Sequence, residues 1–288
     1  MNFHQKNTQP ALYGAGLGFR RSMLQSEQHF NDDQVNFFEV APENWIPVGG
    51  VMGKQFRNMT SQHQFILHGL SLSIGGPTAL DESFIRSVKS FMEKHHIQHY
   101  SEHLSYCSDD GHLYDLMPIP FTEEAVEYVA KRIKRVQEIL EKPLIMENVS
   151  YYAAPGQEMS EMEFMNKVLL KADCEMLLDV NNIYVNSVNH RYDPKAFIDA
   201  MPTERIRYIH MAGHYDEAED LLIDTHGADV KDVVWSLLDY AYQKHGVIPT
   251  LLERDFNIPP LPVLLKEVDQ IKERQIFAQN LTSKPALV

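Results

Sequence analysis

The sequence predicts an α/β fold, a single (β/α)8 barrel that spans residues 1–288 and begins with a polar N-terminal tail at about 1–10. Six short apolar runs each end in a histidine or a carboxylate, and they recur about once every 37 residues, the length of one β/α unit. Amphipathic helical patterns lie between these runs, and no Pro/Gly/Ser-rich linker or charge run divides the chain. A chain of 288 residues is an ordinary size for a one-domain α/β barrel.

Eight strands are expected when two earlier apolar segments are added to the six runs. They cover about 13–19, 36–44, 65–73, 100–106, 143–149, 175–182, 206–213 and 249–254. Gly14, Gly16 and Gly18 lie in the first strand, where we expect them to admit close packing or substrate at the barrel wall. Strands alternating with helices indicate a parallel sheet, and eight of them indicate closure.

The clearest helix is expected over 122–142, where Val126, Val129, Ile133 and Val136 form one apolar stripe. Thr122 stands where an N-cap should. Further helices are expected over 81–95, 161–171, 194–201, 229–245 and 262–278. The crossovers at about 20–33 and 51–63 carry no clean stripe.

The net charge, the cysteine content and the length of the apolar stretches argue against several classes of protein. The formal charge of −14 and the lack of a basic stripe argue against nucleic-acid binding. Cys107 and Cys174 are too few for a disulfide framework, which indicates a reducing, cytoplasmic compartment. No uncharged apolar stretch is long enough to span a membrane, so no membrane partner is expected.

The six runs end in residues whose side chains we expect to meet at the C-terminal mouth of the barrel, where they would hold metal and carry catalysis. These residues are His68, His103, Glu147, Asp179, His210 and Glu253. A carboxylate after an apolar run is costly to bury unless it is paired or bound to metal. Crowded imidazoles and carboxylates therefore predict a metal centre.

Additional donors lie near the later strands. His214, Asp224 and His226 follow the seventh strand in one loop, and Asn182 extends beyond Asp179. About ten donors exceed the needs of one octahedral ion and fit two or three ions that share bridging carboxylates. Imidazole and carboxylate without thiolate suit iron, manganese or zinc, and a site that changes oxidation state favours iron.

Four residues are candidates for substrate contact: Glu39, Glu43 and Asn44 at the end of the second strand, and Asn148 at the end of the fifth. In contrast, His95, His96 and His99 end a helix at the opposite end of the barrel. We expect them to form a solvated C-terminal cap.

The strand-end residues, together with the segments 38–45, 68–76, 101–105, 146–149, 178–182 and 210–214, resemble the DUF692 (UPF0276) family. This family is also called the multinuclear non-haem iron-dependent oxidative enzymes. The resemblance implies a TIM barrel with two or three iron ions (Fe2+/Fe3+) and O2 as co-substrate. It also implies oxidative modification of cysteine residues in a ribosomally synthesised precursor peptide, with a companion protein that recognises the precursor's leader.

Two other classes of function remain open. The same arrangement resembles the wider xylose-isomerase-like superfamily, which includes trinuclear zinc phosphodiesterases of the endonuclease IV type and sugar isomerases. The acidic balance argues against a DNA substrate. A non-enzymatic metal-binding protein, or a scaffold for a peptide partner, would also account for the many donors.

Overall fold

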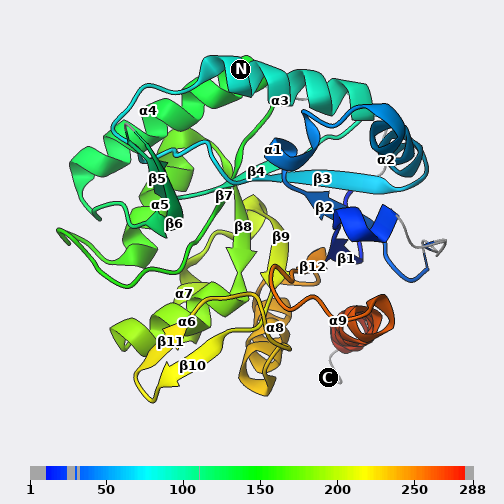
Figure 1. Cartoon of the computed structure of the whole chain (residues 1–288). Helices are drawn as coiled ribbons and strands as arrows, with labels where there is room; N and C mark the ends of the chain where they lie inside the picture. The colour runs from blue at the N-terminus through cyan, green and yellow to red at the C-terminus, as the bar shows by residue number, and fades with distance from the viewer. Residues whose placement is uncertain (1–10, 25–29, 31–32, 110, 283–288) are drawn as a thin grey trace.

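A computed structural model describes residues 11–24, 30, 33–109 and 111–282. Within them, eight parallel strands form a closed barrel with helices outside it, which confirms the expected fold (Figure 1). The barrel order is β1 (Ala15–Gly18), β2 (Phe37–Val40), β3 (Gln64–Gly69), β4 (Tyr100–His103), β7 (Ile145–Glu147), β8 (Glu175–Asp179), β9 (Ile206–Met211) and β12 (Thr250–Leu252), which pairs with β1. The tail expected over 1–10 lies outside the described residues, and the single-domain assignment stays a prediction.

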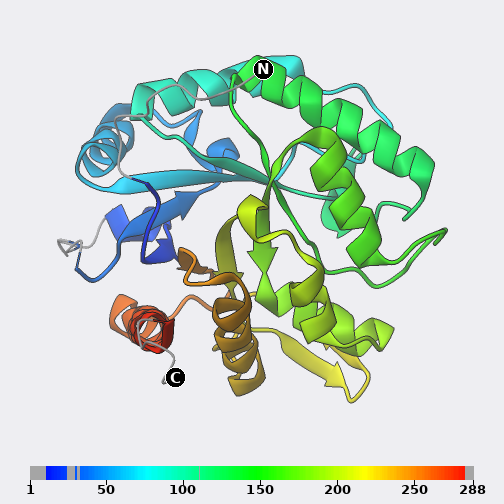
Figure 2. The same ribbon diagram turned by 180° about the vertical axis from the view of Figure 1, so that it is seen from behind.

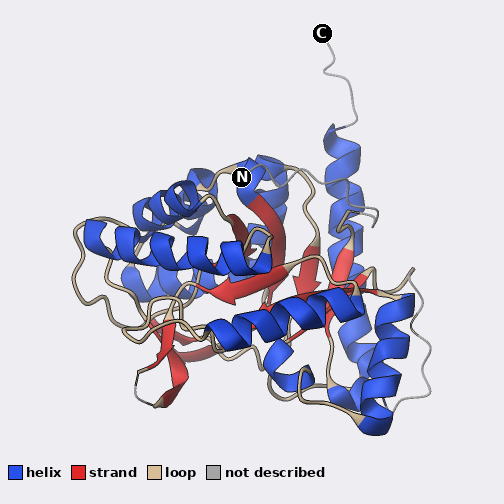
Figure 3. Cartoon of the chain, turned by 90° about the horizontal axis from the view of Figure 1, so that it is seen from above, coloured by secondary structure: helices blue, strands red, loops and turns tan. Residues whose placement is uncertain are grey.

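The helices form a layer around the strands, as Figures 2 and 3 show from two further directions. They are α1 (Pro42–Trp45), α2 (Gly50–Gln62), α3 (Glu82–His95), α4 (Glu123–Leu140), α5 (Glu161–Ala172), α6 (Val180–His190), α7 (Pro194–Ala200), α8 (Asp232–His245) and α9 (Leu261–Thr282), with 3-10 turns at Arg21–Leu24 and Thr203–Arg205. Thr122 caps α4 as expected, because its Oγ1 accepts a hydrogen bond of 3.1 Å from the Ala125 N–H. No helix in the described part of the chain is long and apolar enough to cross a membrane.

Several segments differ from the expected elements; the strand expected over 36–44, for example, ends at Val40 and is followed by α1. The strand expected over 175–182 ends at Asp179, because this residue caps α6: its Oδ1 accepts a hydrogen bond of 2.6 Å from the Asn182 N–H. The strand expected over 100–106 ends at His103 and is followed by the hairpin of β5 (Tyr106–Ser108) and β6 (His112–Met117). A second hairpin, β10 (Tyr215–Ala218) and β11 (Leu221–Ile223), follows β9.

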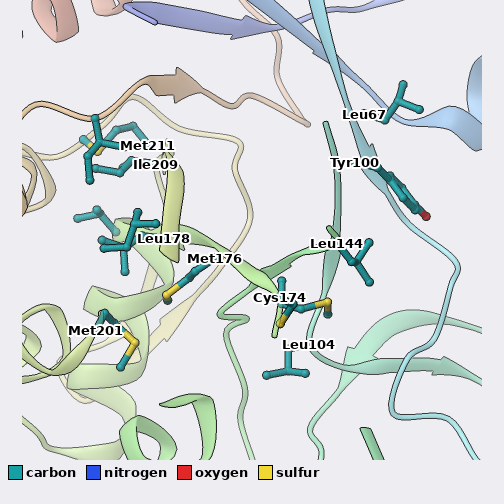
Figure 4. Packing of buried hydrophobic residues seen from close by; sticks show 14 of the residues in the cluster. Leu67, Tyr100, Leu104, Leu144, Cys174, Met176, Leu178, Met201, Ile209 and Met211 are labelled. Carbon is teal, nitrogen blue, oxygen red and sulfur yellow. The ribbon is translucent and has the colours of Figure 1, made fainter. Parts of the chain in front are cut away.

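Alternate strand residues face opposite sides of the barrel wall. Outward-facing residues such as Leu67, Leu178 and Ile209 belong to the large core shared with the helices (Figure 4). A smaller cluster, the inner plug, fills the barrel itself: Leu12, Phe37, Ile66, Ile145, Leu177, Tyr208 and Leu251. Gly16 makes room for this plug, since a Cβ at this position would lie 2.5 Å from the Phe37 ring.

Candidate metal centre

Above the inner plug, a layer of imidazoles and carboxylates lines the barrel at the C-terminal ends of the strands; we name it the metal layer for the ions that it could hold. Because side chains alternate along a strand, each inward-facing residue stands two positions after the previous one. Phe37, Ile66, Ile145, Leu177, Tyr208 and Leu251 of the plug are thus followed by Glu39, His68, Glu147, Asp179, His210 and Glu253, and Ser101 by His103. The structure therefore brings all six sequence-predicted strand-end residues together.

His68, His103 and Glu147 form the first donor group. The Nε2 atom of His68 lies 3.2 Å from Nε2 of His103 and 3.2 Å from Oε2 of Glu147, and the third side of the triangle is 3.4 Å. For comparison, two ligands of a tetrahedral ion lie about 3.4 Å apart when each is about 2.1 Å from the metal. The three donor atoms are therefore about as far apart as three ligands of one tetrahedral ion.

The second side of the mouth is built from β8, β9, β12 and the loop after β11. Oε2 of Glu253 lies 3.0 Å from Nδ1 of His210 and 3.1 Å from Nδ1 of His226, while Oδ2 of Asp179 is 3.8 Å from Nδ1 of His210. Potential ligand atoms lie within 4.8 Å of one another in the groups Glu39/His210/Glu253, Glu147/Asp179/His210 and Asp179/His226/Glu253. Successive groups share Glu147, Asp179, His210 or Glu253, which is the arrangement that bridging ligands of several ions would have.

Without metal, these groups form a buried network of opposite charges. Burial opposes the charge of His68, but Glu147 and Glu39 outweigh it and raise the pKa of His68 to about 9. Burial likewise opposes the charge of Glu147, but His103 and His68 lower its pKa to about 2. Against the same effect of burial, Glu39 and Glu253 hold the pKa of His210 well above its ordinary value. Metal binding would therefore displace protons from the imidazoles.

Several buried polar atoms at the mouth have no hydrogen-bond partner within the described residues. They include Oδ2 of Asp179 and Oδ1 of Asn182. Leaving such atoms unpaired costs about 1–3 kcal/mol each, and a bound cation removes that cost. The donor set, its spacing and these atoms fit a centre of two or three divalent ions.

The further donors expected from the sequence take different positions. Asn182 fits a ligand role, because its Nδ2 donates to Glu147 and its buried Oδ1 is left unpaired. Asp224 lies at the edge of the centre, 2.8 Å from Nε2 of His226, and accepts hydrogen bonds from Ser150 and Asn181. His214 bonds Asn181 through Nδ1 and belongs to none of the donor groups; burial lowers its pKa to about 4.

Three of the four candidates for substrate contact, Glu43, Asn44 and Asn148, also differ from one another. Oε1 of Glu43 accepts hydrogen bonds from the Leu70 N–H and the Ser71 hydroxyl. Asn44 is exposed beside a groove of about 270 Å³. Asn148 is buried, and its amide bonds the backbone of Asp179 on both sides. Substrate contact by these residues stays a prediction.

Sequence reasoning made Glu39 a candidate for substrate contact but assigned it no place in the metal layer, and it gave Ser101 and Tyr208 no role. Glu39 occupies the same layer as the predicted ligands, with its Oε2 3.1 Å from Nε2 of His210 and 2.7 Å from the Tyr208 hydroxyl. The signal was the two-residue spacing from Phe37, but the flanking apolar residues Phe38 and Val40 place Glu39 inside the apolar run rather than at its end.

Comparison with solved structures gives the same barrel. The chain is similar to D-psicose 3-epimerase from Clostridium cellulolyticum, solved with D-tagatose, with a TM-score of 0.56 and 9% identity over 93% of this chain and 98% of that chain. It is also similar to endonuclease IV from Thermus thermophilus, with a TM-score of 0.58 and 13% identity over 92% and 99% of the two chains. At such low identity, these likenesses establish the (β/α)8 barrel fold and nothing about the reaction.

Comparison of sequences is more specific. The chain is 62% identical over 271 residues to the UPF0276 protein of Shewanella sediminis, covering 94% of this chain and 98% of that relative. It is 58% identical over 260 residues to UPF0276 protein Nmul_A2550 of Nitrosospira multiformis, covering 90% of this chain and 92% of that relative. Residues 14–276 match the model of the family described as RiPP precursor modification enzyme MbnB/TglH/ChrH. The chain therefore belongs to this DUF692 family of enzymes that modify ribosomally synthesised precursor peptides.

Proposed function

We propose that this protein is an iron-dependent, O2-using oxidoreductase that modifies cysteine residues of a ribosomally synthesised precursor peptide. The observation that carries the proposal is the set of donor groups that share carboxylates, because it suits several adjacent ions of a metal that prefers imidazole and carboxylate. Iron bound there would supply O2 activation and would take up electrons from the substrate cysteine.

Different side chains at the mouth would bind the metal ions and admit the substrate. His68, His103 and Glu147 would hold one ion, and Asp179, His226 and Glu253 another, with His210 and Asn182 between them. The side chains of His103 and His226 are 15% and 11% exposed, whereas those of Asp179 and His210 are fully buried. The substrate thiol would therefore approach from the side of His103 and His226.

The loops around the mouth favour a peptide over a small molecule. Leu70 after β3, Tyr152 after β7 and Phe256 after β12 are 43%, 50% and 65% exposed. Exposed apolar side chains on the loops of the catalytic end can hold an extended chain. A companion protein that binds the leader would then deliver the cysteine to the mouth. We place the reaction in the cytoplasm, where thiols remain reduced.

The test is metal analysis of the protein purified without oxygen, followed by incubation with precursor and companion. We expect two or three irons per chain. A short Cys-containing precursor and its companion, taken from neighbouring reading frames, should give a product of altered mass only when O2 is admitted. A Cys→Ser precursor is the matched control and should remain unchanged. Stoichiometric zinc, together with cleavage of abasic DNA, would contradict the proposal and favour the phosphodiesterase class.

A further inference from the structure

A continuous chain of hydrogen bonds joins His68 to His210 beneath the metal layer. Nδ1 of His68 lies 2.8 Å from the Ser101 hydroxyl, which lies 2.7 Å from the Tyr208 hydroxyl. Tyr208 donates to Oε2 of Glu39 at 2.7 Å, and the same oxygen is 3.1 Å from Nε2 of His210. All five side chains are buried, with at most 4% of any residue exposed.

The direction of this chain follows from the number of protons available. Oε2 of Glu39 accepts from both of its neighbours, the Tyr208 hydroxyl and the Nε2–H of His210. Tyr208 gives its one proton to Glu39, so its oxygen accepts from Ser101, whose other acceptor within reach, the Leu67 carbonyl, is farther away at 3.1 Å against 2.7 Å. Ser101 in turn accepts from the Nδ1–H of His68. The order of donation is therefore His68 to Ser101 to Tyr208 to Glu39, and this order fixes which nitrogen of each ring carries a proton.

When metal displaces one proton from each ring, the nitrogens that lose it are the ones that face the metal layer. Nε2 of His68 points to Oε2 of Glu147 at 3.2 Å, and Nδ1 of His210 points to Oε2 of Glu253 at 3.0 Å. Metal-binding imidazoles commonly donate their other N–H to a carboxylate, which orients the ring and increases its basicity. Here a single carboxylate serves two rings that lie in different donor groups.

We propose that Glu39, Tyr208 and Ser101 are positioning residues: one buried carboxylate orients and polarises His210 directly and His68 through two hydroxyls. The inference rests on the proposed function only in taking both histidines as metal ligands. Glu39 is accordingly an outer partner of the centre rather than a ligand. The rings of His68 and His210, which lie in different donor groups, are thus connected to the same carboxylate.

The experiment uses the full-length chain loaded with Zn2+, a diamagnetic ion that suits the same ligands, with 15N-labelled histidine for NMR. The wild type should show His68 with a protonated Nδ1 and His210 with a protonated Nε2. Glu39→Gln keeps an acceptor oxygen and removes the charge, so it should shift the N–H resonances of both rings. It should also lower zinc affinity about 10- to 100-fold, as loss of an outer partner does.

The Tyr208→Phe variant tests how Glu39 acts on His68. It distinguishes an effect passed through the two hydroxyls from a direct effect of the electric field of the carboxylate. In this variant Ser101 can donate instead to the Leu67 carbonyl, 3.1 Å away, so His68 should keep its tautomer with a shifted N–H resonance. In the Tyr208→Phe background, Glu39→Gln should still shift the resonance of His210 and should no longer shift that of His68. Ser101→Ala, a second and smaller change, should affect His68 alone.

Tyr100→Phe is the matched control. It removes an equally buried phenol hydroxyl that has no hydrogen-bond partner among the described residues, and it should leave both rings unchanged. If Glu39→Gln leaves the N–H resonance of His68 unchanged, or shifts this resonance equally with and without the Tyr208 hydroxyl, the proposal is wrong. The zinc-loaded protein performs no O2 chemistry, so the NMR result does not depend on the reaction. If the NMR shows that Glu39 affects both rings but the iron-loaded protein oxidises no precursor, only the proposed function is overturned. Failure of both rings to bind zinc would overturn both.

Discussion

Buried histidines occur at both ends of this barrel, and their surroundings differ. At the mouth, His68 and His210 lie among carboxylates. At the opposite end, His95 at the end of α3 lies 2.9 Å from the Thr60 hydroxyl, and His245 at the end of α8 lies 2.7 Å from the Thr203 hydroxyl. Burial is similar at the two ends, so burial alone does not mark a metal ligand.

The difference lies in the charge of the partners. Hydroxyl partners do not stabilise an imidazolium enough to offset burial, so burial lowers the pKa of His95 to about 4 and also lowers that of His245. Carboxylates at the mouth raise the pKa of His68 and His210 instead. The structure also corrects the expectation of a solvated cap for His95, which is 5% exposed and packs against Phe56 and Phe91.

The largest expected difference between the two ends is in metal content. His68→Ala removes one corner of the first donor triangle, and we expect its ion to be lost while helical content is unchanged. His95→Ala is the control at the other end and should keep the full metal content. Elemental analysis and circular dichroism measure both quantities. Unchanged metal content in His68→Ala would break the distinction between the two ends.

Metal binding should also stabilise the fold through the mouth. At free zinc about 100 times the dissociation constant, each ion adds about 2.7 kcal/mol to the free energy of unfolding. We expect His95→Ala to gain as much from zinc as the wild type does, and His68→Ala to gain less by one ion's contribution. Urea unfolding with and without a chelator measures these gains, and equal gains in all three proteins would contradict the assignment.

At the opposite end, the effect of substitution should be on stability alone. His95→Ala removes a buried ring, 4.3 Å from the Phe91 ring centroid, and its hydrogen bond to Thr60. We expect a loss of about 2 kcal/mol in the metal-free protein. Urea unfolding with chelator present checks this value. A variant as stable as the wild type would show that the ring contributes nothing to the packing of this end.

The smallest effect concerns pH. His95 has a pKa of about 4 when folded, against about 6.5 in an unfolded chain. Its contribution to stability is therefore complete above about pH 6.5 and is lost as pH falls toward 4. His95→Gln should reduce the fall in unfolding free energy between about pH 7 and 5.5 by on the order of 1 kcal/mol. Identical pH profiles for the two metal-free proteins would contradict this.

Local patterns in the sequence were enough to find the barrel and most of the metal layer. His68, Glu147 and Glu253 each follow an apolar run, and the wall of a closed barrel brings such positions together. Thr122 was identifiable as a cap because its hydrogen bond reaches only three residues along the chain.

Features that depend on distant partners could not be found in this way. Ser101 and Tyr208 are 107 positions apart, and nothing near either residue indicates their hydrogen bond. Helix α6 lacked a recognisable stripe because it is buried on several sides, from Val180 to Ser187. Asn182 was therefore assigned to a strand, although its side chain does reach Glu147.

Asp179 performs two tasks with its two oxygens. Oδ1 closes the first turn of α6, while the unpaired Oδ2 faces the metal layer. At the far end of the same helix, Asn189 bonds both backbone groups of Leu222 in the hairpin of β10 and β11. One helix therefore holds both a candidate ligand inside the barrel and the hairpin at its rim, so the positions of Asp179 and Leu222 are fixed by the same element.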